Sequence, residues 1–98
     1  MARVVVTARV ADIIVYLTEK AGILVATRYR NDLDAAYDRL AGFPGAGSPR
    51  KALGRDARIV LVYPYVIVYD HVGDTVTILR VLHCRRNITR RLVRRTER

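Results

Sequence analysis

The sequence predicts a small α+β fold, in which an antiparallel pair of helices packs on a twisted antiparallel β-sheet. In the first half of the chain, apolar residues recur at helical spacing. The second half contains β-branched and aromatic runs separated by turn residues. A chain of 98 residues is long enough for one domain with one modest core. We therefore expect residues 1–98 to form a single domain with the element order β-α-α-β-β-β-α.

The N-terminal part predicts a strand followed by a helix. Val4–Val6 is a β-branched run typical of a short edge strand, and Thr7 is placed to cap the helix that follows. Asp12 falls in the first turns of this helix, where the helix dipole favours an anion. Gly22 interrupts the helical pattern. Between residues 8 and 20, one helical face carries the apolar residues Val10, Ile13, Ile14 and Leu17.

A second helix is predicted from about Ile23 to Leu40. The short turn at Ala21-Gly22 would make the two helices an antiparallel hairpin. One face of the second helix carries the stripe Tyr29, Leu33, Ala36, Tyr37 and Leu40. The opposite face carries the charged residues Arg30, Asp34, Asp38 and Arg39.

The next part of the chain predicts a loop and a three-stranded meander. Residues 42–49 are dense in glycine and proline and are expected to be loop, and the chain then stays polar and basic through Asp56. Pro64 separates the first two strands, and Gly73-Asp74 is suited to a tight turn before the third. The three strands are expected at Arg58–Tyr63, Tyr65–Asp70 and Thr75–His83.

Charge is the strongest compositional signal. The formal net charge is +9, with 18 Lys and Arg against 9 Asp and Glu. Residues 85–98 carry seven arginines and one glutamate. The same segment has an apolar stripe of Ile88, Leu92 and Val93, which predicts a basic helix docked on the sheet. Its arginines either bind phosphates or an acidic protein, or they form an ordinary solvated helix face.

Nothing in the sequence points to a cofactor, a metal or a membrane. Cys84 is the single cysteine, so neither an internal disulfide nor a cysteine metal cluster is expected. Phosphate loops, dinucleotide fingerprints, zinc spacings and paired-carboxylate motifs are missing. No apolar run reaches the roughly 18 residues of a membrane span, and the N-terminus lacks the features of a signal peptide. We expect a cytoplasmic protein with no cofactor and no metal.

His83 is the residue around which an active site could be built. It neighbours Cys84, but adjacent residues on a strand point to opposite faces, which argues against a thiol–imidazole pair. Together with Arg80, Arg85 and Arg86, it could form an RNA-cleaving site, in which arginines stabilise the phosphate charge and the imidazole moves a proton. The alternative is that His83 ends the strand and the arginines make surface contacts.

Several motifs, in order along nearly the whole chain, match one family. The predicted helices carry Ala11-Asp12-Ile13-Ile14-x-Tyr16 and Ala26-x-x-Tyr29-x-x-x-Leu33-x-x-Ala36-x-x-x-Leu40. Phe43-Pro44-x-x-Gly47 follows in the loop, and Arg58 opens the meander. The last motifs are Tyr65-Val66-Ile67-Val68-Tyr69 and Ile78-Leu79-Arg80-Val81-Leu82-His83-x-Arg85-Arg86. In this order and at these distances, the chain resembles the RelE/ParE superfamily of bacterial toxin–antitoxin (plasmid stabilisation) toxins, and the ParE branch most.

The resemblance implies a toxin whose hydrophobic groove is wrapped by the C-terminal segment of a cognate antitoxin, ParD-like or similar, in a hetero-oligomer. ParE-like toxins are associated with inhibition of DNA gyrase, whereas RelE-like toxins are ribosome-dependent mRNA endonucleases that use basic residues with a C-terminal Tyr or His. Here no tyrosine follows residue 69, and Arg50, Lys51 and Arg55 do not clearly match the catalytic lysine cluster. The sequence therefore favours a non-enzymatic gyrase inhibitor, with a RelE-like ribonuclease as the alternative.

Two sets of residues are expected to carry these functions. A groove between the hairpin and the sheet would expose apolar residues to an acidic, partly disordered antitoxin segment, and the candidates are Tyr16, Leu17, Tyr37 and Leu40. The target would be bound by the end of the third meander strand and the basic tail, through His83, Arg85, Arg86, Arg90 and Arg91. In the ribonuclease alternative, the catalytic residues would be His83, Arg80 and Arg85.

Overall fold

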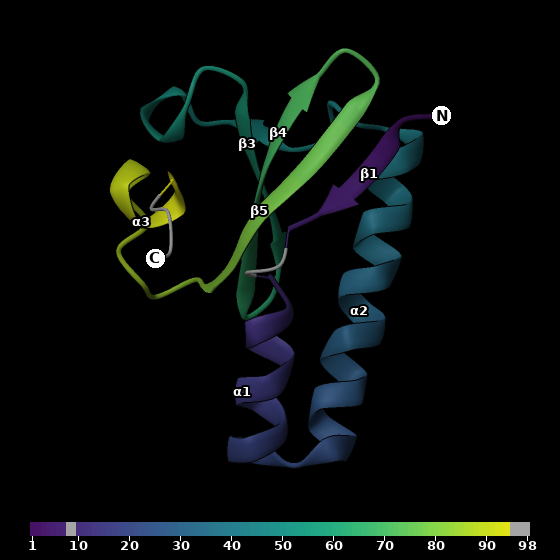
Figure 1. Cartoon of the computed structure of the whole chain (residues 1–98), viewed down its shortest axis with the longest axis vertical. Helices are drawn as coiled ribbons and strands as arrows, with labels where there is room; N and C mark the ends of the chain where they lie inside the picture. The colour runs from purple at the N-terminus through teal and green to yellow at the C-terminus, as the bar shows by residue number, and fades with distance from the viewer. Residues whose placement is uncertain (8–9, 95–98) are drawn as a thin grey trace.

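The computed structural model describes residues 1–7 and 10–94 (Figure 1). The predicted helix start at residue 8, the side chain of Asp12 and residues 95–98 lie outside this description. The fold class is α+β, as predicted. The elements are β1 Arg3–Val6, α1 Ala11–Ala21, α2 Ile23–Gly42, β2 Ser48–Pro49, the 3₁₀ helix η2 Lys51–Leu53, β3 Ala57–Val62, β4 Tyr65–Val72, β5 Thr75–His83 and α3 Arg90–Arg94.

The sheet has five strands in the order β1-β5-β4-β3-β2. As predicted, β3, β4 and β5 form an antiparallel meander, and β1 is an edge strand. However, β1 pairs in parallel with β5, from Arg3 opposite Thr75 to Val6 opposite Ile78. The expectation of a wholly antiparallel sheet is therefore wrong for this pair. Strand direction alternates from β3 to β4 to β5, and β5 therefore runs in the same direction as β1.

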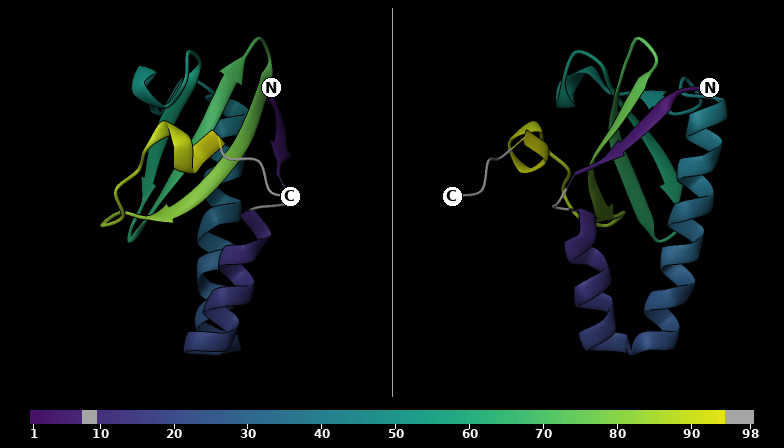
Figure 2. Two further views of the ribbon diagram at one scale, coloured as in Figure 1. Left: turned by 60° about the vertical axis from the view of Figure 1, so that its left-hand side comes forward. Right: turned by 45° about the vertical axis from the view of Figure 1, so that its right-hand side comes forward.

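The sheet separates two layers. The helix hairpin of α1 and α2 lies on one side of it, and η2 and α3 lie on the other (Figure 2). The hairpin-side core contains both predicted helical stripes and buries Val10, Leu17, Ala26, Leu33, Ala36, Leu40, Tyr65, Ile67, Tyr69, Val76, Ile78 and Val81. The α3-side core confirms that the C-terminal helix docks on the sheet, and it buries Leu53, Ala57, Val66, Val68, Leu82 and Val93.

One additional residue in β5 determines which side chains face each layer. Two adjacent residues of β4 pair with Ile78 and Arg80, so that Leu79 between them has no partner of its own. Leu79 packs in the α3-side core, and the neighbouring Arg80 donates a hydrogen bond from Nη1 to the carbonyl of Leu92 at 3.0 Å. Both side chains therefore face α3, and Val81 returns to the hairpin-side core. This β-bulge resets the alternation of the strand.

Two local expectations are wrong. Thr7 does not cap α1, because its hydroxyl donates a hydrogen bond to the carbonyl of Leu79 at 3.2 Å, and the N-cap position is occupied by Val10 without a side-chain hydrogen bond. The region 42–49 is not loop throughout, because Ser48–Pro49 pairs with β3. Proline is tolerated there because β2 is an edge strand, where a missing N–H does not interrupt the sheet.

Tyr69 fastens the loop between α2 and β2 to the sheet. Its side chain is fully buried, and its hydroxyl donates a hydrogen bond to the Pro44 carbonyl at 2.8 Å and accepts one from the Gly47 amide at 2.9 Å. Arg58 donates further hydrogen bonds to the carbonyls of Gly45 and Gly47. Position 47 requires glycine, because a Cβ there would lie 2.5 Å from the Tyr69 hydroxyl oxygen.

Tyr69→Phe is expected to lower the free energy of unfolding by about 1–3 kcal/mol, because the buried Gly47 amide loses its acceptor. Urea unfolding followed by circular dichroism measures this loss. Tyr63→Phe is the matched control, since Tyr63 is exposed and its hydroxyl should change stability by less than about 0.5 kcal/mol. Equal stability of the two variants would contradict the role given to Tyr69.

Candidate functional site

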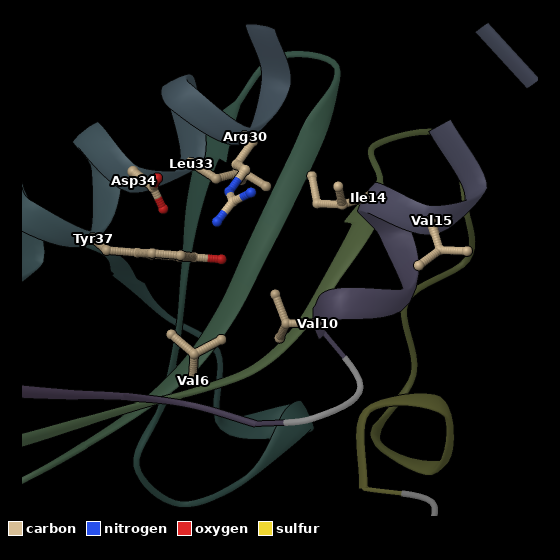
Figure 3. Close-up of a pocket in the computed structure, with 8 residues that line it drawn as sticks. All are labelled: Val6, Val10, Ile14, Val15, Arg30, Leu33, Asp34 and Tyr37. Carbon is tan, nitrogen blue, oxygen red and sulfur yellow. The ribbon is translucent and has the colours of Figure 1, made fainter. Parts of the chain in front are cut away.

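An apolar groove opens where β1, α1 and α2 meet (Figure 3). Its volume is about 460 Å³. The strand and α1 line it with aliphatic side chains, whereas α2 contributes polar groups as well. The lining residues are Val6, Val10, Ile14, Val15, Arg30, Leu33, Asp34 and Tyr37. The four residues from α2 are three or four positions apart, which places them along one strip of the helix surface.

The hydroxyl of Tyr37 lies in this groove. Its oxygen is buried and has no hydrogen-bond partner within the described part of the chain. Figure 3 shows the hydroxyl and the guanidinium of Arg30 pointing into the same space. Burial raises the pKa of Tyr37 to about 12, and the carboxylate of Asp34 contributes to that rise. The hydroxyl is therefore neutral at pH 7 and can donate a hydrogen bond to an acceptor that enters the groove.

The elements that form the groove carry exposed apolar side chains, and two of these, Val6 and Val15, line the groove itself. On β1, Val5 and Val6 expose 37% and 47% of their surfaces. No strand of the described chain pairs with the outer edge of β1. On the hairpin, Val15 and Tyr16 are 56% and 55% exposed, and Leu24 near the turn is 85% exposed. The exposed Val6 and Val15 give the groove an apolar rim, which is typical of a surface that contacts another protein.

The structure divides the four residues predicted to bind an antitoxin. Tyr16 is exposed, and Tyr37 lines the groove. Leu17 and Leu40 are 6% and 1% exposed, so the expectation that they would be exposed is wrong. Around the helix circumference, both lie at the centre of their apolar faces, and both are buried in the hairpin-side core.

Sequence reasoning missed other groove residues. Arg30 and Asp34 are predicted on the charged face of the second helix, and both are exposed, yet they also line the groove. They are three or four positions from Leu33 and Tyr37 and therefore lie at the margin of the apolar stripe. This position at the margin of the apolar stripe is the sequence signal for a groove residue. It identifies the groove only when the position of α1 is known.

The residues predicted to bind the target follow β5. Among the described residues, Arg85, Arg86, Arg90 and Arg91 are all exposed. His83 is exposed as well, and its ring packs edge-on against Tyr65, with the ring centroids 5.8 Å apart. The Nδ1 atom of His83 accepts a hydrogen bond from the backbone amide of Arg85 at 3.1 Å. The imidazole is thereby oriented at the end of the strand.

The predicted ribonuclease residues do not converge. Arg80 lies on the α3 side, where it bonds the Leu92 carbonyl, whereas His83 is paired with Tyr65 and lies on the hairpin side. Cys84 is half-buried and packs with the α3-side core, so His83 and Cys84 occupy opposite faces, as strand alternation predicts. Among the described residues, no group of three or more His, Cys, Asp or Glu is arranged to hold a metal ion.

Comparison with known proteins assigns the chain to a class of toxins. Residues 6–88 match a family described as "ParE toxin of type II toxin-antitoxin system, parDE". The chain is 33% identical over 78 residues to Toxin ParE3 of Caulobacter vibrioides, which covers 80% of this chain and 78% of the relative. It is 35% identical over 72 residues to Toxin ParE1 of the same species, which covers 74% of each. The chain belongs to the ParE toxin family of type II toxin–antitoxin systems.

A solved structure shares the fold. It is described as "Chromosomal ParDE TA system from P. aeruginosa" and matches with a TM-score of 0.66 at 18% identity, covering 85% of this chain and 96% of the matched chain. The predicted family and fold class are therefore confirmed. None of the helices in the described ranges is long and apolar enough to cross a membrane.

Proposed function

We propose that a cognate antitoxin, ParD-like or similar, neutralises this toxin by binding in the groove between β1, α1 and α2. The observation that carries the proposal is the Tyr37 hydroxyl, a buried donor that has no partner within the described residues and lies in an otherwise mostly aliphatic groove. The exposed Val15 lines the groove, and the exposed Tyr16, next to it in the chain, is a further candidate contact. The likeness to a solved structure that is described as a ParDE TA system supports a hetero-oligomer with an antitoxin.

The antitoxin segment needs a particular chemistry to fill this groove. Aliphatic side chains suit the walls, and a carboxylate or carbonyl oxygen suits the Tyr37 hydroxyl and the Arg30 guanidinium together. The sequences of α1 and α2 carry four cations and five anions, so the hairpin itself gives little attraction for acids. We expect the net charge of +9 to speed the encounter, and apolar burial with ordering of the segment to supply the affinity.

We further propose that the toxin arrests growth by binding DNA gyrase in the cytoplasm, without covalent chemistry of its own. Family membership supports gyrase as the target, and the exposed His83, Arg85, Arg86, Arg90 and Arg91 are the proposed contacts. The separation of Arg80 and His83 on opposite faces supports binding over catalysis. RNA cleavage on the ribosome is the second candidate, and the observation in its favour is the exposed, oriented imidazole of His83 beside Arg85.

Tyr37→Phe should change stability and antitoxin affinity in opposite directions. The toxin alone should become more stable by up to about 1 kcal/mol, because a buried hydroxyl without a partner is removed. Antitoxin affinity should fall about five- to tenfold, because a hydrogen bond is lost in the complex. Thermal denaturation and titration calorimetry measure the two effects. Tyr29→Phe, which changes a tyrosine outside the groove lining, should leave the affinity unchanged. A less stable Phe variant with normal affinity would refute the groove proposal.

The stability of Tyr37→Phe should also differ from that of the wild type in its dependence on pH. Folding raises the pKa of Tyr37 from 10.0 to about 12, so the folded chain keeps the hydroxyl protonated where the unfolded chain ionises. The stabilisation from this difference is complete below pH 10 and is lost as the pH rises towards 12. Between these values, the wild type should lose more free energy of unfolding than Tyr37→Phe. Parallel losses in the two proteins would contradict the assigned burial.

Two assays on the purified toxin, run side by side, distinguish the candidate targets. We expect inhibition of gyrase supercoiling, no ribosome-dependent cleavage of mRNA, and relief of the inhibition when the antitoxin is added.

Replacement of Arg85, Arg86, Arg90 and Arg91 with Glu should abolish growth arrest while folding and antitoxin binding survive, since all four are exposed and none lines the groove. His83→Ala should weaken toxicity modestly. A non-toxic His83→Ala variant combined with a toxic charge-reversed variant would establish the ribonuclease instead.

A further inference from the structure

The structure brings together two basic segments that are far apart in the sequence. The segment around η2 and the helix α3 lie side by side on the sheet face opposite the helix hairpin (Figures 1 and 2). Leu53 of η2 and Val93 of α3 are buried in the same core. Arg94 links the two segments, because its Nε donates a hydrogen bond to the Leu53 carbonyl at 3.0 Å and its Nη atoms bind the carboxylate of Asp70 at 2.8 Å.

This juxtaposition forms a surface that we call the basic face. Its exposed cations are Arg50, Lys51, Arg55, Arg90 and Arg91. Two more exposed cations, Arg85 and Arg86, lie in the connection between β5 and α3. Among nearby acids, Asp70 is neutralised by Arg94, which leaves Asp56 as the exposed carboxylate in the η2 segment. The excess positive charge of the protein is therefore concentrated opposite the hairpin, whose sequence carries more anions than cations.

The composition of the basic face favours a nucleic acid over an acidic protein as its ligand. In protein interfaces most of the binding energy comes from a few residues, mainly Trp, Tyr and Arg, packed in desolvated pockets, so that aromatic anchors accompany the arginines. Within the described residues, none of the exposed large apolar side chains lies in the ranges 48–56 or 84–94. Binding to a phosphate backbone needs no such anchor, because its affinity comes from charge neutralisation and counterion release. Four of the five cations of the face are arginines, whose planar fork matches phosphate oxygens.

We propose that the basic face binds the phosphate backbone of a nucleic-acid duplex, independently of base sequence. Arg50, Lys51 and Arg55 contact one part of the backbone, and Arg90 and Arg91 contact another. Arg94 acts as a positioning residue that fixes α3 against η2 and so sets the spacing between the two groups. The proposal goes beyond the assignment of a gyrase target, with which it shares Arg90 and Arg91, because it concerns direct contact between this chain and a nucleic-acid duplex in the absence of any other protein. Its test uses Arg50, Lys51 and Arg55, which are not among the proposed gyrase contacts.

Fluorescence anisotropy with the purified toxin tests the proposal. The probes are a short DNA duplex of random sequence and an RNA duplex of the same sequence, each titrated over a series of salt concentrations. We expect binding that weakens linearly on a logarithmic salt scale. Simultaneous replacement of Arg50, Lys51 and Arg55 with Glu should reduce the magnitude of the salt slope by about two to three and weaken binding at least about tenfold at low salt. Tighter binding of one duplex identifies whether DNA or RNA supplies the phosphates.

The matched control reverses three exposed cations on the helix hairpin, Lys20, Arg28 and Arg39, which changes the net charge by the same amount. This variant should bind the duplex as the wild type does. Equal losses of affinity in the two variants would show that overall charge alone causes binding. Unchanged binding in the η2 variant would show that the basic face does not bind the duplex. If polyglutamate displaces the duplex when its glutamate residues are as concentrated as the duplex phosphates, the face would be assigned to acidic proteins. Any of these three outcomes overturns the proposal, and circular dichroism confirms that each variant is folded.

Discussion

The β-bulge at Leu79 is the constraint on which the two-sided architecture depends. With regular alternation from Val76 and Ile78, the side chain of Arg80 would point into the hairpin-side core, where an unpaired charge is strongly unfavourable. The additional residue turns Arg80 towards α3 instead, where its guanidinium meets the Leu92 carbonyl. It also returns Val81 to the hairpin-side core. A single inserted residue thus keeps charge out of one core and helps to hold the C-terminal helix on the other.

Two surfaces of different chemistry result from this arrangement. The hairpin side carries an apolar groove with an unsatisfied donor, Tyr37, at the unpaired edge of the described sheet. The opposite side carries exposed cations around η2 and α3, and in the described ranges 48–56 and 84–94 no large apolar side chain is exposed. An antitoxin in the groove would therefore not need to cover the basic face. Neutralisation would then act through steric or conformational exclusion of the target.

The parts of the fold that repeat with a clear period could be predicted from the sequence. The stripes containing Leu17 and Leu40 predict both helices, and the apolar residues near Val93 predict the docking of α3. The parallel pairing of β1 could not be predicted, because local sequence determines the conformation of a strand and not the direction of its neighbour. The bulge at Leu79 was also missed, since a strand with one extra residue has the same composition as a regular strand.

The candidate sites were less accessible to sequence reasoning than the fold. A helical stripe shows which residues avoid water, but it does not show which of them lie at its margin, and so Leu17 and Leu40 were expected in the groove whereas Arg30 was not. The basic face depends on contacts between η2 and α3, such as that between Arg94 and the Leu53 carbonyl. These residues are 41 positions apart, and no local pattern encodes their proximity.

The antitoxin groove and the basic face are, on this interpretation, separate surfaces on opposite sides of the sheet. Hydrogen exchange of the backbone amides, measured by mass spectrometry on the toxin with and without its antitoxin, tests that separation. We expect slower exchange in β1, α1 and α2 on complex formation, with unchanged rates in η2 and α3. Slower exchange confined to η2 and α3, with β1 and the hairpin unchanged, would contradict it.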